Sequence, residues 1–204
     1  MPKTKSRKSL EEIYTGIVES LKTTTPKIMK DIKYYRTVDY HDWKDNDFLE
    51  TMTSVIFPIL GWDIVKSKWK AIKEAFLNFD VDKVASYTEK DVKRLLKTPN
   101  IIPNKAKIRG IIQNAKQVQE IIREYGSFSN YVCFYPYDLK QDLVERFYGL
   151  GEKTVLDFMK EMGFPVIKDD KHIRKVFYRL GLVDSEDVEQ EEILSIAKEI
   201  AEAA

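Results

Sequence analysis

The segment FYGLGEKT, residues 147–154, has two glycines on either side of one apolar residue, and Lys153 follows the second glycine by two positions. Glycine adopts backbone conformations that other residues avoid, so this spacing predicts a tight turn between two helices. Backbone N–H groups at such a turn can face a phosphate. Asp170 lies 17 positions after Lys153 and offers a carboxylate for chemistry on a sugar. If one site holds all three features, the protein acts on nucleic acid.

Helical periodicity dominates the rest of the sequence, and no sustained alternation typical of strands is found, so the fold class is all-α. Thr88 and Asp91 have the spacing of a capping box, with Asp in place of the usual Glu or Gln. Residues 38–46 are expected to be a loop, and residues 127–137 either a loop or a short helix. The predicted helices cover residues 10–21, 26–35, 48–60, 62–76, 81–85, 92–96, 105–125, 139–147, 154–162, 171–180 and 189–203.

The charge of the chain is balanced overall but uneven along its length. The 204 residues carry a formal net charge of +1, which gives no bulk argument for a polyanionic partner. Residues 2–8 are basic, and residues 184–202 are strongly acidic. A surface for nucleic acid must therefore be a local patch.

Cysteine and hydropathy exclude several classes of protein. Cys133 is the single cysteine, so neither an internal disulfide nor a four-cysteine iron–sulfur or zinc site can form. No apolar run reaches 18 residues, which predicts no membrane span. The start of the chain lacks an apolar signal core, so we expect a cytoplasmic, nucleoid-associated protein.

The order of motifs in the second half resembles the helix–hairpin–helix (HhH-GPD) DNA glycosylase superfamily, and in particular its endonuclease III-like glycosylase/AP lyases. In that superfamily a hairpin of the form L-P-G-V-G-x-K-T precedes a glycine/proline-rich loop and a V-D-x-H segment. Here FYGLGEKT is followed by GFP at residues 163–165 and DKHI at residues 170–173. Tyr148 stands where the hairpin proline often is, and Asp169 where an apolar residue often is.

The first half is similar to 3-methyladenine DNA glycosylase I. The likeness covers Tyr40-His41-Asp42 and runs of sequence within residues 62–115. The cysteines of that enzyme's zinc site are absent, and Ser54 lies near the position of its pocket glutamate. The resemblances imply a glycosylase core over residues 38–183. The helical patterns on either side predict N-terminal helices over residues 1–37 with a basic tail (1–8) and an acidic C-terminal helix over 184–204, which we expect to pack back on the core. The resemblances also imply a two-lobed helical bundle with the active site between the lobes.

The resemblance gives roles to the residues around the turn. Asp170 would stabilise positive charge at C1′ of the sugar, and Lys153 would attack C1′ as the nucleophile of an AP lyase. Gly149, Leu150 and Gly151 would hold the DNA backbone, helped by Lys171 and Arg174. Each has a plainer interpretation: Asp170 as a helix cap, Lys153 and the other cations as solvated surface residues, and the glycines as an ordinary turn.

Three aromatic residues are candidates for stacking on a flipped base: Trp62, Tyr40 and Trp43. Trp62 is the strongest of them, because it aligns with the pocket tryptophan of 3-methyladenine DNA glycosylase I. The alternative is that they pack in the core, as most aromatic residues at helical spacing do. Trp69 and His172 are better explained by packing and by capping.

The two resemblances imply a DNA N-glycosylase of base-excision repair that removes an alkylated purine such as 3-methyladenine, with an associated AP lyase activity. Two alternatives stay open: a bifunctional glycosylase/AP lyase for oxidised bases, and a non-catalytic DNA-binding module. The expected substrate is double-stranded DNA with a damaged base or an abasic site, bound by a monomer. No metal or iron–sulfur cofactor is expected, apart from a monovalent or divalent cation at the hairpin.

Overall fold

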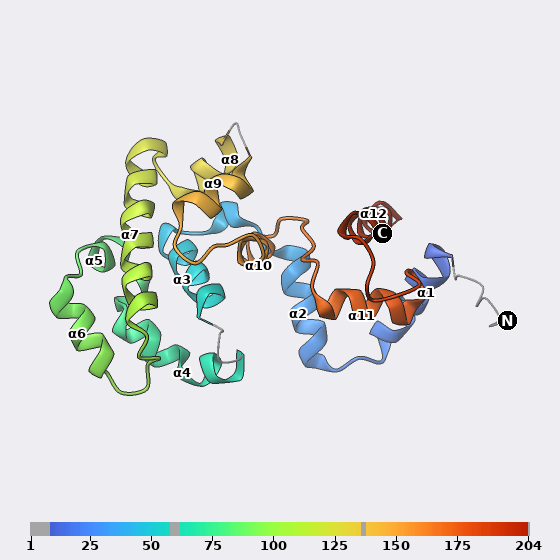
Figure 1. Cartoon of the computed structure of the whole chain (residues 1–204), viewed down its shortest axis with the longest axis horizontal. Coiled ribbons are helices and arrows are strands. Elements are labelled where there is room, and N and C mark those ends of the chain that lie inside the picture. Colours follow the sequence, from blue (N-terminus) through green and yellow to red (C-terminus); the bar gives the residue numbers. More distant parts are fainter. Residues whose placement is uncertain (1–8, 58–61, 136–137, 204) are drawn as a thin grey trace. The chain divides into compact units, whose positions relative to one another are not determined.

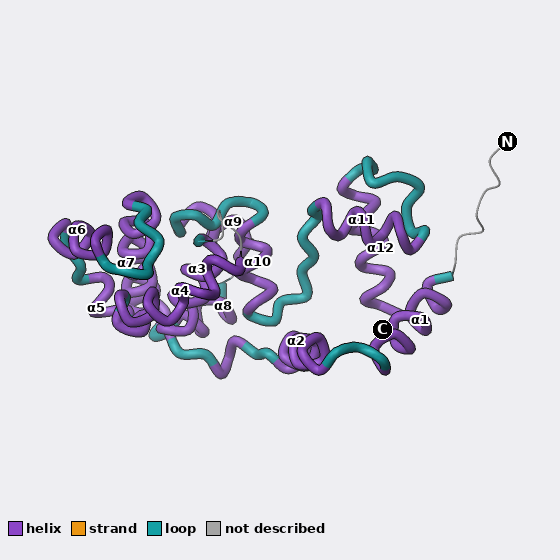
Figure 2. The backbone as a smooth tube through the Cα atoms, turned by 90° about the horizontal axis from the view of Figure 1, so that it is seen from below, coloured by secondary structure: helices purple, strands orange, loops and turns teal. Residues whose placement is uncertain are grey.

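A computed structural model describes residues 9–57, 62–135 and 138–203 of the chain. Within this part every regular element is a helix, and no strand is present (Figures 1 and 2). Contacts divide the chain into two compact units. One unit is formed by residues 38–164, and the other by the two ends of the chain, up to residue 37 and from residue 165 onward. Residues 165–183, which the resemblance groups with the glycosylase core, therefore contact the chain-end unit.

The described residues of the 38–164 unit form ten helical elements, of which α7 (Lys105–Tyr125) is the longest (Figure 1). They are η1 (Tyr40–Asp42), α3 (Asp45–Ile56), α4 (Trp62–Ala75), η2 (Leu77–Phe79), α5 (Val81–Ala85), α6 (Glu89–Lys97), α7 (Lys105–Tyr125), α8 (Phe128–Phe134), α9 (Leu139–Arg146) and α10 (Thr154–Glu161).

Helix α7 forms the centre of this unit, and α3, α5, α6 and α8 pack against it. Its apolar stripe is fully buried at Ile108, Ile111, Ala115 and Val118. Burial of each large apolar side chain contributes roughly 1.5–3 kcal/mol, so this stripe is a major source of stability. The Asn104 side chain caps the start of the helix by accepting the N–H of Lys107 at 3.1 Å.

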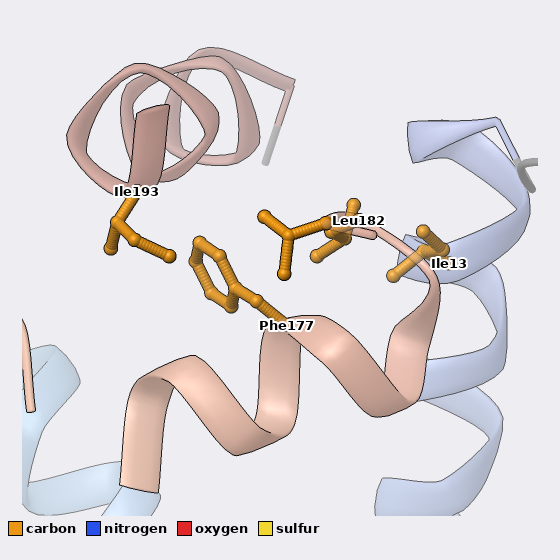
Figure 3. Close-up of a cluster of buried hydrophobic side chains, with 5 residues drawn as sticks. Ile13, Phe177, Leu182 and Ile193 are labelled. Atoms are coloured by element: carbon orange, nitrogen blue, oxygen red, sulfur yellow. The ribbon is translucent and has the colours of Figure 1, made fainter. Parts of the chain in front are cut away.

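The chain-end unit contains α1 (Leu10–Lys22), α2 (Pro26–Thr37), α11 (Lys171–Leu180) and α12 (Gln190–Ala203). Its core is a small cluster that joins α1 to α11, α12 and the segment between them (Figure 3). The members of this cluster are Ile13, Phe177, Leu182, Val183 and Ile193. Helix α2 has no buried residue.

Most predicted helices are confirmed, including α7 with both of its ends. The Thr88–Asp91 capping box is also confirmed, since Thr88 N–H donates to Asp91 Oδ2 at 2.9 Å. Residues 127–137 contain a short helix, α8. The predicted loop over residues 38–46 is wrong in part: residues 40–42 form a 3₁₀ turn because the Asp39 carboxylate accepts the His41 N–H at 2.9 Å, and α3 begins already at Asp45. Of the predicted helix over 48–60, residues 58–60 lie outside the described part.

Candidate functional site

A turn that we call the glycine turn, residues 147–153, connects α9 to α10. Gly149 has a φ of +82°, and a Cβ atom there would lie 3.0 Å from side-chain atoms of Ile56. Both the backbone conformation and the close approach therefore require glycine at this position. Leu150 is buried, and its N–H donates to the carbonyl oxygen of Phe147 at 3.3 Å. The predicted tight turn between two helices is confirmed.

The outer side of the glycine turn presents backbone donors. Among the residues that the structure describes, none accepts a hydrogen bond from the N–H groups of Gly149, Gly151 or Lys153. A Cβ atom added at Gly151 would meet no heavy atom within 4 Å. The N-terminus of α10, with its partial positive charge, begins directly after these groups. The turn can therefore accept an anion such as a phosphate through backbone contacts alone.

Lys153 is the residue that directly precedes α10, and its side chain is exposed. The neighbouring Glu152 carboxylate pairs with the ammonium of Lys140 and not with Lys153. In the described part of the chain, no residue forms an ion pair with Lys153. Its amine is therefore accessible to a substrate that binds at the glycine turn.

A partly buried polar network holds α9, the helix that leads into the glycine turn. The Asp142 carboxylate accepts hydrogen bonds from the hydroxyl groups of Tyr131 and Tyr135 and from Arg146 Nε. Partial burial raises the pKa of Asp142, but these three donors outweigh it and hold the pKa below its usual value. The carboxylate stays ionised at neutral pH and fixes α9 against α8.

Asp170 lies in the chain-end unit and caps α11. Its Oδ1 accepts the N–H groups of His172 at 2.8 Å and Ile173 at 3.1 Å. Partial burial raises the pKa of Asp170, but the two N–H bonds and the nearby charges of His172 and Lys168 lower it further, so the pKa lies below its usual value. The capping interpretation is thus confirmed, and the carboxylate is ionised at neutral pH.

Arg174 is held by contacts within the chain-end unit. Its guanidinium makes a two-point pair with Asp169, at 2.6 and 2.7 Å, and donates to the carbonyl oxygen of Val188 at 2.7 Å. These bonds tie α11 to the loop before α12. The phosphate contact expected for Arg174 stays a prediction, whereas Lys171 is exposed at the first position of α11.

Tyr40, one of the three candidate base-stacking residues, is half-buried beside two other rings. Its ring stacks on Phe164, with centroids 5.3 Å apart, and on His41 at 4.1 Å. Burial is the main cause that raises the pKa of the Tyr40 hydroxyl, and the electrostatic effects of Cys133 and Asp39 add to it. Trp43 packs against the buried Phe48 at 5.2 Å, which favours the packing interpretation. The side chain of Trp62 lies outside the described part of the structure.

Two charged residues in this unit were not singled out from the sequence. Lys107 is 6% exposed, and its ammonium donates to the carbonyl oxygens of Ile56 and Phe57. Burial lowers the pKa of Lys107. The Glu50 carboxylate accepts a hydrogen bond from Trp69 Nε1 at 3.1 Å and forms an ion pair with Lys73 Nζ at 2.8 Å. Trp69 is therefore held within this unit as a packing residue, as expected. A signal for Lys107 was present, because it interrupts the apolar stripe of α7 at helical spacing.

The described residues contain no group of three or more His, Cys, Asp or Glu side chains that could hold a metal ion. Cys133 is exposed and stands alone. The zinc site of 3-methyladenine DNA glycosylase I therefore has no matching donor set in the described residues. No helix in this part of the chain is long and apolar enough to span a membrane.

Comparison with known proteins defines the class of the 38–164 unit. A family model described as methyladenine glycosylase matches residues 38–148, more than half of the chain. The chain belongs to this family. The match ends at Tyr148, inside the glycine turn, and so covers most of one compact unit.

Curated relatives match over a shorter segment. DNA-3-methyladenine glycosylase of Haemophilus influenzae is 30% identical over 73 residues, which cover 36% of this chain and 40% of that protein. DNA-3-methyladenine glycosylase 1 of Escherichia coli strain K12 is 34% identical over 73 residues, or 36% and 39% of the two chains. The matched segment thus spans about two fifths of the length of these relatives.

Solved structures extend the likeness. The structure of 3-methyladenine DNA glycosylase I from Staphylococcus aureus aligns with a TM-score of 0.55 and 26% identity, over 65% of this chain and 84% of that chain. A variant of 3-methyladenine DNA glycosylase I in complex with 3-methyladenine gives the same TM-score at 28% identity, with the same shares. The expectation of an all-α fold like that of the family is confirmed.

Proposed function

We propose that this protein is a DNA N-glycosylase of base-excision repair, which removes an alkylated purine such as 3-methyladenine from double-stranded DNA. The observation that carries the proposal is the family match over residues 38–148. The curated relatives named above are 3-methyladenine glycosylases. The order of motifs after residue 148 supports the wider assignment to the helix–hairpin–helix superfamily. Such an enzyme would act as a monomer, at the nucleoid.

We assign DNA binding to the glycine turn. The open N–H groups of Gly149, Gly151 and Lys153 suit a phosphate of the DNA backbone, and Leu150 anchors the turn from inside. Contacts of this kind read no base sequence, as a repair enzyme requires. Lys171 would add a charge contact to phosphate. We assign Tyr40 and Trp62 to the base pocket, where an aromatic ring would stack on the flipped base, whereas the contact of Trp43 with Phe48 favours a packing role for Trp43.

Asp170 is the proposed catalytic carboxylate. Breaking an N-glycosidic bond builds positive charge on C1′, and an ionised carboxylate stabilises that charge. The two N–H bonds that cap α11 keep Asp170 ionised and fix its direction. The group can then also accept a proton from the water that attacks C1′.

Release of free base from a duplex with a single 3-methyladenine tests the proposal. The wild-type protein should release the base, and Asp170→Asn should lose at least about a hundredfold in rate. Asparagine caps a helix as well as aspartate does, so this variant should keep its fold and its affinity for abasic-site DNA. Folded wild-type protein that releases no base from duplexes with alkylated, oxidised or deaminated bases would support the binding-module alternative.

An AP lyase activity is a second proposal, favoured by the unpaired Lys153 amine at the glycine turn. The neutral amine would add to the aldehyde C1′ of an abasic site and lose water to form a Schiff base. Loss of a C2′ proton would then expel the 3′ phosphate by β-elimination, and hydrolysis would free the lysine. Borohydride reduces the Schiff base to a stable amine and so traps the complex. Trapping by wild type but not by Lys153→Gln is expected, and no adduct with wild type rules the lyase out.

A further inference from the structure

The glycine turn is attached to α7 by one buried side chain, Asn114. The N–H of Tyr148 donates to Asn114 Oδ1 at 2.8 Å, and Asn114 Nδ2 donates to the carbonyl oxygen of Tyr148 at 3.1 Å. Asn114 is 1% exposed and lies 34 positions before Tyr148 in the chain. One amide thus satisfies both polar groups of a single backbone residue, as a neighbouring strand would.

Gly110, one helical turn before Asn114, completes the attachment. A Cβ atom at Gly110 would lie 1.9 Å from Cδ1 of the Tyr148 ring, so the ring rests directly on the backbone of α7. Gly110 and Asn114 are spaced i, i+4 and share a face of the helix. The helix therefore holds the ring and the backbone of Tyr148 at once, next to Gly149.

Tyr148 occupies the position at which the hairpin pattern quoted above often has proline. Proline would restrict φ and has no N–H to donate. In this chain the restriction comes from outside the turn, through the two hydrogen bonds to Asn114. A loop that is ordered before binding loses less conformational entropy when its ligand arrives, so its affinity is higher.

We propose that Asn114 is a positioning residue, which holds the Tyr148 backbone so that the N–H groups of Gly149 and Gly151 are ordered for DNA phosphate before DNA binds. This inference rests on the DNA-binding role proposed for the glycine turn. It does not depend on base release, and it concerns a residue that touches no DNA itself.

The test compares Asn114→Leu with Thr53→Val in the full chain. Leucine has the same number of side-chain heavy atoms, branched at the same carbon, but makes neither hydrogen bond. Thr53 is equally buried, and its hydroxyl bonds only within α3, to Leu49, so Thr53→Val reports what a lost buried hydrogen bond does elsewhere. Three quantities are measured: the exchange rate of the Tyr148 amide by NMR, the thermal midpoint, and the Kd for a duplex with an abasic-site analogue.

Asn114→Leu should speed exchange of the Tyr148 amide in the free protein and weaken duplex binding about tenfold, equivalent to ~1.4 kcal/mol. Thr53→Val should leave the Kd within about twofold at a similar loss of thermal midpoint. Equal Kd values for Asn114→Leu and wild type would overturn the inference, and so would a wild-type protein that binds no duplex. A wild-type protein that binds DNA but releases no base would instead refute the proposed activity. The comparison of Kd values would then still test the role of Asn114.

If Asn114→Leu does not fold, Asn114→Asp decides the question. Aspartate can still accept the Tyr148 N–H, but it cannot donate to the Tyr148 carbonyl oxygen. Gln113→Asp, at the exposed neighbouring position, adds the same charge and is the matched control. Binding weaker for Asn114→Asp than for Gln113→Asp supports the inference, and equal binding refutes it.

Discussion

The ammonium Nζ of Lys107 lies 2.5 Å from the backbone carbonyl oxygen of Ile56, a residue 51 positions away, and 3.2 Å from that of Phe57. These carbonyl groups end α3, where helix oxygens lack partners within the helix and carry partial negative charge. Lys107 thus caps α3 from another helix and joins the end of α3 to the start of α7.

Lys107→Met should lower the free energy of unfolding by about 2–3 kcal/mol, because two buried carbonyl groups lose a charged donor. Urea unfolding followed by circular dichroism measures the change. Lys105→Met, at an exposed position of the same helix, is the control and should stay within about 0.5 kcal/mol of wild type. Equal stability of the two variants would show that the cap contributes nothing.

Replacement of Gly149 and of Gly151 by alanine should have different effects on stability. Gly149→Ala places a side chain at φ +82° and against Ile56, which should lower the free energy of unfolding by about 1–2 kcal/mol. Gly151→Ala should leave stability nearly unchanged, since its methyl group meets no other atom. It should still weaken duplex binding roughly tenfold if a phosphate approaches the backbone there. Undiminished DNA binding by Gly151→Ala would count against the phosphate site.

Because of Asp170, the free energy of unfolding should vary with pH in the acid range. Its folded-state pKa lies below the ordinary value of 3.8, so its stabilising contribution is complete above pH 3.8 and is lost as the pH falls through the folded-state pKa. The stability difference between wild type and Asp170→Asn should therefore be constant near neutral pH and change below pH 3.8. Chemical unfolding at a series of pH values measures this difference, and parallel curves for the two proteins down to the lowest pH would disprove the linkage.

Substitution of Arg174 should affect mainly stability, whereas substitution of Lys171 should affect mainly DNA binding. Arg174→Gln breaks the pair with Asp169 and the bond to Val188, so it should lower the thermal midpoint. Lys171→Gln should leave the midpoint unchanged, weaken duplex binding, and reduce the slope of log affinity against log salt by about 1. An unchanged salt slope for Lys171→Gln would remove Lys171 from the DNA surface.

Local signals explain which parts of the fold could be predicted. Helix α7 has a capping Asn104, a long apolar stripe and Gly126 with φ +82° at its end, so both ends follow from the sequence. The 3₁₀ turn η2 was missed because Leu77, Asn78 and Phe79 all have positive φ, which is uncommon for leucine and phenylalanine and is readily adopted only by the asparagine. Burial of the Phe79 ring in the core stabilises this conformation.

Long-range partners explain what could not be predicted at the site. The glycine turn and the cap at Asp170 both have signals in residues close in sequence, and both were predicted. The interrupted apolar stripe of α7 marks Lys107 as unusual, but the backbone partners of Lys107 and Asn114 lie 34 to 51 positions away, and no local pattern identifies them. The resemblance placed residues 165–183 with the glycosylase core, whereas the contacts of Phe177 and Leu182 with Ile13 place them with the chain ends.

The cluster around Ile13 has a consequence for how the protein is made. A ribosome releases α1 long before α11 and α12, so the apolar face of α1 has no partner for most of the time of translation. Residues 38–164 can complete their own contacts during that interval, because domains generally fold as units. The nascent chain is therefore a candidate for chaperone binding at α1 until Phe177 and Ile193 emerge.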